Sequence, residues 1–209
     1  MTLTRRALVL AGQVVLAGWA ISAHADGGAP AAVAPVRQLL DGLLLIMKAG
    51  PDTPFVRRYD MMAPVIDRVF DLDAILRSSV GLSWSSLPPD QQDQLRSAFC
   101  RYTTASYVNS FDHFDGQRFT VEPQLRPADN EEQIVVTRIT PRSGDSHEID
   151  YVMRNTPSGW RVVDVLADGA VSRVAVQRSD FRRSLSRGGA PALANNLATK
   201  SLRLSDGMS

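Results

Sequence analysis

The spacing of apolar residues changes near the middle of the chain, and this change limits what the chain can fold into. Before residue 115, apolar side chains recur every three or four residues, which is the period of an amphipathic helix. After it, apolar and polar residues alternate, as in a half-buried strand. The sequence therefore predicts a helical first half followed by a sheet, the pattern of an α+β domain.

Four helices are expected in the first half. Gly50-Pro51 stops the first of them, and Pro64 is expected to bend or split the second. Asp71 can cap the third, and Gly81 can end it. The predicted helices cover Val36–Lys48, Phe55–Phe70, Asp71–Val80 and a long segment from Pro88 toward Phe114.

Turn-forming residues divide the second half into short strands. Segments rich in Pro, Gly, Asp, Asn and Ser separate the alternating runs, which predicts an antiparallel meander of about four strands. The runs are Phe119–Leu125, Ile134–Val136, Ile149–Met153 and Trp160–Val162. Apolar residues also occupy the opposite face, for example Val135, Ile139, Val163 and Val165, so we expect the sheet to be covered on more than one side.

Helical periodicity returns after Asp168-Gly169. One helix is expected from Val171 toward Leu185 and a last short one near Leu193–Leu197, beyond a Gly-Gly-Ala-Pro segment. The predicted fold is α+β, with helices packed on a curved antiparallel sheet of about four strands and enclosing an apolar pocket.

The first 25 residues have the order of a secretory signal peptide. Arg5 and Arg6 precede an apolar run to Ile21, and Ala23-His24-Ala25 offers the small residues that a signal peptidase reads. The run is shorter than the roughly 20 residues that span a bilayer, which favours cleavage over an uncleaved anchor. The expected organisation is a signal peptide over 1–25, a flexible linker over 26–35, one domain over 36–200 and a flexible tail over 201–209.

Composition excludes several classes of protein. The 209 residues carry 23 Lys and Arg against 22 Asp and Glu, so bulk charge does not favour a polybasic nucleic-acid binder. Without Arg5 and Arg6 the mature chain has 21 positive and 22 negative charges, or −1. Cys100 is the single cysteine, which rules out an intrachain disulfide and a four-cysteine zinc site.

Catalytic motifs are absent from the sequence. It has no glycine-rich phosphate loop, no H-E-x-x-H, no G-x-S-x-G and no EF-hand loop. The cluster Asp112-His113-Phe114-Asp115 could supply oxygen and nitrogen ligands to a divalent metal, although a solvated helix end explains it better. Cys100 lies beside Phe99 in a predicted helix and is expected to be a buried apolar residue rather than a nucleophile.

Two features point to binding. Long, soft apolar side chains are frequent in the helical half and suit a pocket for flexible chains, although each could equally be core. Five arginines also recur along the predicted C-terminal helix and could face an anionic surface or an acidic partner. They are Arg173, Arg178, Arg182, Arg183 and Arg187.

Several short motifs give the chain a family resemblance. The most specific run from Gly159-Trp160-Arg161 through Asp168-Gly169 to Arg178-Ser179-Asp180-Phe181, preceded by Val80–Trp84 and Pro89–Gln92. Over roughly Val36–Leu197 the chain resembles the MlaC-type family of periplasmic lipid-binding proteins, also called the toluene-tolerance family. The segment 164–179 looks closest to the hopanoid-associated HpnM branch, although Val176-Gln177 replaces an Asn-Tyr pair found in many members.

The resemblance implies a periplasmic carrier without catalysis, cofactor or metal. Such a carrier would hold a phospholipid or hopanoid-type lipid and exchange it between an inner-membrane ABC transporter complex and an outer-membrane lipoprotein complex. The predicted partner-docking set is Arg182, Arg183 and Arg187. The predicted lipid-binding residues are Leu43, Met47, Met62, Ile66, Val69, Leu82, Phe99, Tyr151 and Val171.

Two other functions stay open at this point. A structural adaptor would keep the fold but fill the pocket with its own side chains. A small enzyme would need a buried carboxylate or tyrosine with a shifted pKa, for which Tyr107, Tyr151 and Asp150 are the candidates.

Overall fold

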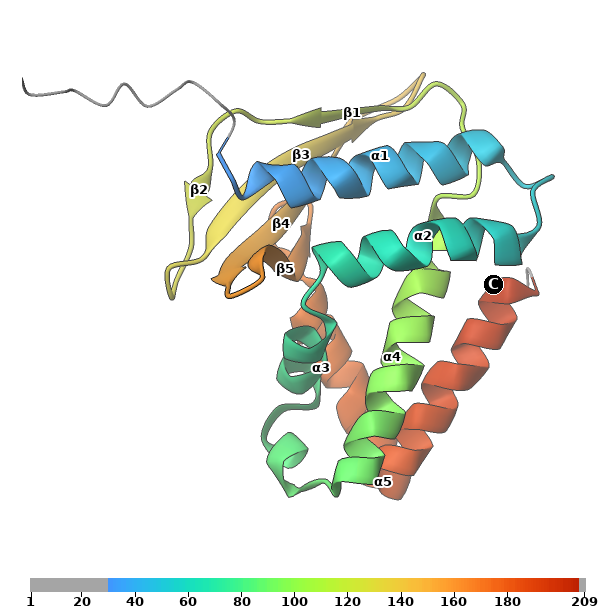
Figure 1. Ribbon diagram of the computed structural model, residues 1–209, viewed down its shortest axis with the longest axis vertical. Helices are drawn as coiled ribbons and strands as arrows, with labels where there is room; N and C mark the ends of the chain where they lie inside the picture. Colours follow the sequence, from blue (N-terminus) through green and yellow to red (C-terminus); the bar gives the residue numbers. More distant parts are fainter. Residues whose placement is uncertain (1–29, 207–209) are drawn as a thin grey trace, which may run out of the picture.

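The computed structural model describes residues 30–206 and shows an α+β fold in which helices cover an open antiparallel sheet (Figure 1). The predicted signal peptide lies outside the described residues. The helices are α1 (Val33–Ala49), α2 (Phe55–Val69), α3 (Leu72–Val80), the 3-10 helix η1 (Gly81–Ser86), α4 (Pro89–Ser110) and α5 (Arg173–Ser205). The strands are β1 (Arg118–Val121), β2 (Arg126–Pro127), β3 (Gln133–Thr140), β4 (His147–Thr156), β5 (Gly159–Ala167) and β6 (Val171–Ser172).

The first three helices follow the predicted periodicity. The Asp71 carboxylate accepts a hydrogen bond from the Ala74 amide at 2.9 Å and caps α3. Gly50 and Gly81 end α1 and α3 with φ of 71° and 75°, a conformation that favours glycine. Pro64 lies inside α2 without splitting it, so of the two predicted effects, bending or splitting, the split is wrong.

The last two helices differ from their predicted lengths. α4 ends at Ser110, four residues before Phe114, because Phe111 leaves the helical conformation at φ −122° and ψ 59°. α5 begins at Arg173 and reaches Ser205, well beyond Leu197, so residues 201–205 of the expected tail are helical. Residues 33–35 of the expected linker are also helical, because α1 begins at Val33.

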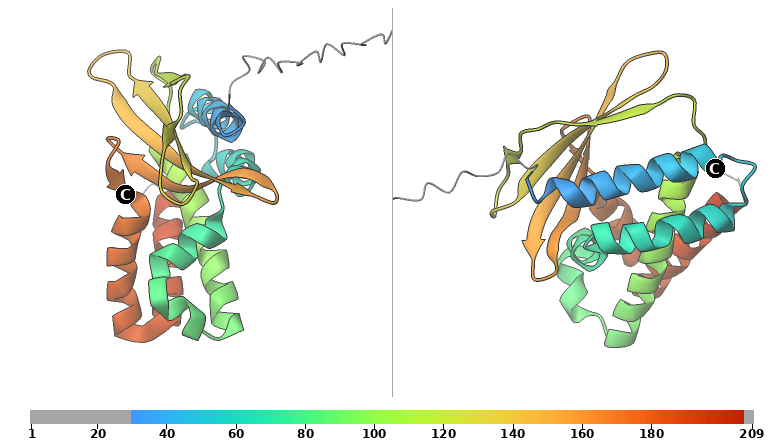
Figure 2. Two further views of the ribbon diagram at one scale, coloured as in Figure 1. Left: turned by 90° about the vertical axis from the view of Figure 1, so that its left-hand side faces the viewer. Right: turned by 45° about the horizontal axis from the view of Figure 1, so that its top comes forward.

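α5 is interrupted at Gly188 and Gly189. Gly189 has φ of 65°, and the helix is non-helical at both glycines. Figure 2 shows that the two halves, 173–187 and 190–205, turn back on one another, and α4 packs beside them. Phe181 in the first half meets Phe99 of α4 edge to face, with ring centroids 6.1 Å apart.

The sheet has six strands rather than the predicted four. Its order is β1-β3-β4-β5-β6, all antiparallel, with β2 also paired to β3. The four main strands match the alternating runs, while β2 and β6 are two residues long and carry no period that a sequence could reveal. The run expected over Phe119–Leu125 is shorter than predicted, since β1 ends at Val121, and β2 starts only after the run, at Arg126.

Both faces of the sheet bury apolar residues, as the two-sided pattern predicts. The inner face joins the main core through Val135, Tyr151 and Val162, which pack with α1, α2 and α4. On the other face Ile134, Val152 and Val163 form a smaller cluster. The helices therefore lie mainly against one face of the sheet, where a concave surface can form.

Candidate functional site

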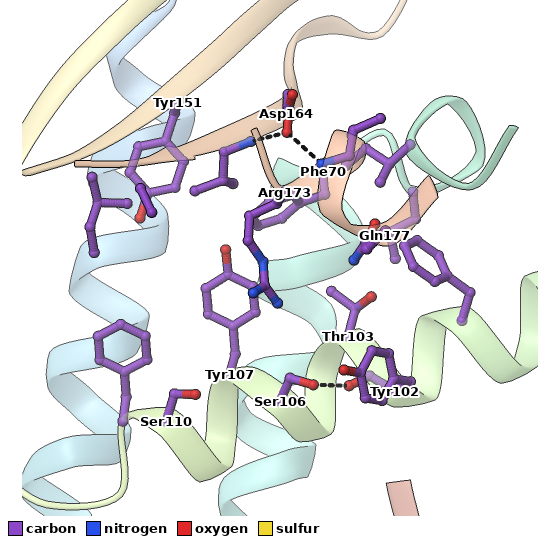
Figure 3. Close-up of a pocket in the computed structure, with 18 residues that line it drawn as sticks. Phe70, Tyr102, Thr103, Ser106, Tyr107, Ser110, Tyr151, Asp164, Arg173 and Gln177 are labelled. Carbon is purple, nitrogen blue, oxygen red and sulfur yellow. Dashed lines mark hydrogen bonds between the residues drawn. The ribbon is translucent and has the colours of Figure 1, made fainter. Parts of the chain in front are cut away.

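A pocket opens between α4, the inner face of the sheet and the start of α5 (Figure 3). Its volume is about 280 Å³, just below the about 300–1,000 Å³ found for small-molecule sites. Its lining residues are Phe70, Leu72, Ile75, Phe99, Tyr102, Thr103, Ser106, Tyr107, Ser110, Phe111, Ile149, Tyr151, Asp164, Val165, Ala167, Arg173, Val174 and Gln177.

One face of α4 forms the longest wall of this pocket. Its lining residues are spaced by three and four positions, so their side chains project on the same side of the helix. Aromatic rings dominate: Tyr107 lies 5.5 Å from Phe70 and 6.1 Å from Phe111, measured between ring centroids. Hydroxyl groups of Ser106 and Thr103 are interspersed among these rings.

The sheet and the first turn of α5 form the opposite wall. Ile149, Tyr151 and Val165 provide apolar surface from β4 and β5. Asp164 also lines this wall, but its carboxylate accepts hydrogen bonds from the Val174 amide at 3.0 Å and from the Ser172 hydroxyl at 2.5 Å. Asp164 therefore fixes the start of α5 against β5.

The two pocket tyrosines remain protonated. Burial raises the pKa of Tyr107 and of Tyr151 well above the usual range of a phenol. Each hydroxyl can therefore serve as a hydrogen-bond donor, but neither is prepared to act as a phenolate base near neutral pH.

Asp150, the third candidate for catalysis, does not join these tyrosines. It neighbours Tyr151 on β4 and therefore points to the opposite face of the sheet. There its carboxylate lies 2.6 Å from the guanidinium of Arg126, and burial raises its pKa. Asp150 and the two pocket tyrosines are therefore separate candidates on opposite sides of the sheet.

The nine predicted lipid-binding residues fall into three groups. Phe99 and Tyr151 line the pocket. Leu82 on η1 and Val171 on β6 are 99% and 52% exposed and do not line it. The other five are packed in the core of α1 and α2, away from the pocket lining: Leu43, Met47, Met62, Ile66 and Val69. Helical periodicity identifies an apolar face, but it does not distinguish a pocket wall from a filled core.

The predicted docking arginines share one region of the surface. Arg182, Arg183 and Arg187 are exposed on the first half of α5. Arg182 also lines a groove together with the exposed Leu82 of η1. Arg178 behaves differently, because its guanidinium donates to the Ser78 carbonyl at 2.7 and 2.9 Å and joins α5 to α3.

The other candidate sites have ordinary surroundings. His113 is exposed with its Nδ1 2.8 Å from the Asp112 carboxylate, and residues 30–206 contain no group of three potential metal ligands. Burial raises the pKa of Cys100, the opposite of what a reactive thiol requires. Within the described residues, no helix combines the length and apolar character needed to cross a bilayer.

Sequence reasoning missed most of the pocket. The predicted set included no residue of α4 after Phe99, although Tyr102, Ser106 and Tyr107 follow Phe99 at helical spacing. The available signal was the mixed character of that face, where hydroxyl-bearing residues alternate with aromatic ones at helical spacing. A filled core would use mainly apolar residues at such positions.

Comparison with known proteins assigns this fold to a family. The chain shares 24% identity over 132 residues with the toluene tolerance protein ttg2D of Pseudomonas putida; the match covers 63% of this chain and 60% of that protein's length. A phospholipid-binding protein from Ralstonia solanacearum, solved in complex with a phospholipid, has the same fold: the TM-score is 0.72 at 23% identity, covering 84% of this chain and 99% of that one. The family model described as MlaC protein matches residues 37–199. Since this match spans most of the sequence, the chain belongs to the MlaC family.

Proposed function

We propose that this protein is a periplasmic carrier that binds a lipid without catalysing a reaction. The observation that carries the proposal is the pocket, whose walls are mainly aromatic and aliphatic and which opens between α4, the sheet and α5. Each methylene group buried there would contribute about 0.8 kcal/mol, so an acyl or polycyclic chain can bind while its polar end stays near water. Membership of the MlaC family supports the same function.

Phe99 and Tyr151 are the predicted contacts that we assign first to this lipid. Both lie in the pocket wall, where an apolar chain would touch them. Contact of the lipid with the five core residues of α1 and α2 stays a prediction, and it applies to a lipid whose acyl chain extends past the pocket. Such a chain would have to displace core side chains, because the volume of about 280 Å³ is small for a whole two-chain lipid.

Extraction of the purified protein with organic solvent tests the proposal directly. Mass spectrometry should find about one lipid per protein molecule. The variant Ser106→Trp should lose this lipid, because the indole would occupy the pocket. Ser97→Trp is the matched control, since Ser97 is exposed on another face of the same helix and should keep the lipid.

Circular dichroism must show that both variants are folded. Equal lipid content in the two folded variants would refute the pocket as the binding site. A wild-type protein that carries no lipid and binds none when it is offered would instead support the structural adaptor.

The class of lipid and the partners are finer proposals. The resemblance of segment 164–179 to the hopanoid-associated HpnM branch supports a hopanoid-type lipid, while the name of the Ralstonia solanacearum protein supports a phospholipid. We propose transfer of one of these between an inner-membrane ABC transporter complex and an outer-membrane lipoprotein complex. The extracted lipid distinguishes the two classes, and copurification with membrane complexes tests the partners.

The proposed function requires that the protein is exported to the periplasm. We propose that residues 1–25 are removed after Ala25, so that the mature chain starts at Asp26. N-terminal sequencing of periplasmic protein should read Asp-Gly-Gly-Ala. A mature protein that retains residues 8–16 would contradict cleavage.

Docking on a partner is proposed for Arg182, Arg183 and Arg187. Exposed charge of one sign raises encounter rates with an anionic surface and adds less to final affinity. Changing all three to Glu should slow lipid transfer, leave bound lipid unchanged and reduce the salt dependence of the rate. The matched control makes the same charge change at the exposed residues Arg57, Arg68 and Arg101 of α2 and α4. Equal rates in the two triple variants would show that these arginines are only solvated surface.

A further inference from the structure

One cationic side chain lines the pocket. Arg173 is the first residue of α5 and the only basic residue among the described residues that form the pocket wall. Figure 3 shows its side chain extending from the start of α5 across the pocket toward Tyr107. The remaining wall is mainly apolar and aromatic, so this guanidinium is the chief positive charge that a bound molecule would meet.

Arg173 has no carboxylate partner in residues 30–206. Other arginines of the domain do: Arg96 pairs with Asp73 at 2.8 Å, and Arg126 pairs with Asp150 at 2.6 Å. Asp164 is the one carboxylate in the pocket wall, and its two oxygens accept from the backbone and the Ser172 hydroxyl instead. The guanidinium donors of Arg173 therefore remain available to a ligand.

Further polar groups lie around the same space. The Tyr107 side chain lies beside the Arg173 guanidinium (Figure 3). Thr103 contributes a buried hydroxyl that has no hydrogen-bond partner in the described part of the chain. Gln177, one turn along α5, accepts a hydrogen bond from Ser79 through its side-chain oxygen at 3.1 Å. Arginine and hydroxyl donors facing a common space suit an oxyanion.

We propose that Arg173 binds the anionic group, a phosphate or carboxylate, of an amphiphile whose apolar chain occupies the pocket. The inference rests on the proposed lipid-binding function and narrows its substrate to an ionic lipid. A planar guanidinium can hold two oxygens of such a group at once. The placement of one cation in the wall of an apolar pocket would also fix the orientation of the ligand, with its charged end at the start of α5.

The test compares ligands that carry oleoyl chains but differ in their polar ends. Delipidated protein is titrated with dioleoyl phosphatidic acid, dioleoylglycerol and oleate, each in competition with a fluorescent fatty acid. The wild type should bind phosphatidic acid about ten-fold more tightly than dioleoylglycerol. Arg173→Gln should lose most of this preference while its affinity for dioleoylglycerol stays unchanged, and Arg173→Lys should keep part of it.

Arg203→Gln is the matched control, because Arg203 is exposed on the same helix beyond Gly189 and should behave as the wild type. Retention of the full preference in Arg173→Gln would overturn the inference and leave the proposed function intact. Failure of the wild type to bind any of the three lipids would overturn both. A further arm adds inorganic phosphate: if phosphate alone binds in an Arg173-dependent way and no lipid displaces it, the site recognises a free ion and the inference is wrong.

Discussion

Replacing Thr103 by valine should stabilise the lipid-free protein. The Thr103 hydroxyl lies buried in the pocket wall of α4 and has no hydrogen-bond partner in residues 30–206. A hydroxyl buried without a partner costs about 1–3 kcal/mol in measurements on proteins. Valine has nearly the same shape and a similar helix propensity, so the change removes this cost with little effect on packing. We expect the free energy of unfolding to rise by about 1–2 kcal/mol.

Thermal and urea unfolding of delipidated protein measure this gain. In a domain of this size, 1 kcal/mol corresponds to a rise in Tm of about 2–4 °C. Thr137→Val is the control, because Thr137 is also a threonine with a buried hydroxyl, but that hydroxyl donates to the Ile149 carbonyl at 2.5 Å. The control should lose about 1–3 kcal/mol. A loss of stability in Thr103→Val as well would mean that its hydroxyl has a partner, and the reasoning would be refuted.

Three further predictions concern packing and charge. Phe181→Ala should lower the free energy of unfolding by about 3–5 kcal/mol, measured by unfolding in urea, because Phe181 is 4% exposed and packs on Phe99. A loss below about 1 kcal/mol would contradict this packing. Gly169→Ala should lower Tm, since Gly169 has φ of 68° and a new Cβ would lie 2.5 Å from the Glu148 carboxylate. An unchanged Tm would show that the Glu148 side chain moves aside freely and that the backbone tolerates alanine at this φ. Burial raises the pKa of Asp150, so the fold binds its proton more tightly than the unfolded chain does, and its contribution to stability is lost as pH rises through the folded pKa. The stability of Asp150→Asn relative to wild type should therefore increase from about pH 3.5 upward, and a difference that stays constant between pH 3 and 8 would exclude the shift.

Local sequence signals were sufficient to predict most of the helices and strands, but they were insufficient to predict which residues line the pocket. Asp71 and Gly81 bound α3 because capping and left-handed backbone depend on neighbouring residues alone. Met62 and Phe99 follow the same helical period, yet one is packed between helices and the other lines the pocket. That difference depends on which element lies opposite, and no single segment encodes it.

It was equally hard to predict from the sequence which apolar side chains are exposed to solvent. Leu82 is 99% exposed although its residue type favours burial, because η1 projects it away from the core. The strands β2 and β6 were missed for another reason. Each is two residues long, so each exists only through its pairing with a longer neighbour.

The position of the pocket between α4 and α5 has a consequence for the order of folding. The strands β3, β4 and β5 are joined by short turns and pair with their neighbours in sequence, so they close small loops at low entropic cost. The walls of the pocket, in contrast, come from α4 and from the start of α5, and the whole sheet lies between them in the chain. Contacts of high sequence separation form late, because the loop that they close must first be ordered. We therefore expect the pocket to assemble after the sheet, and detachment of α5 to open it while the strands stay paired.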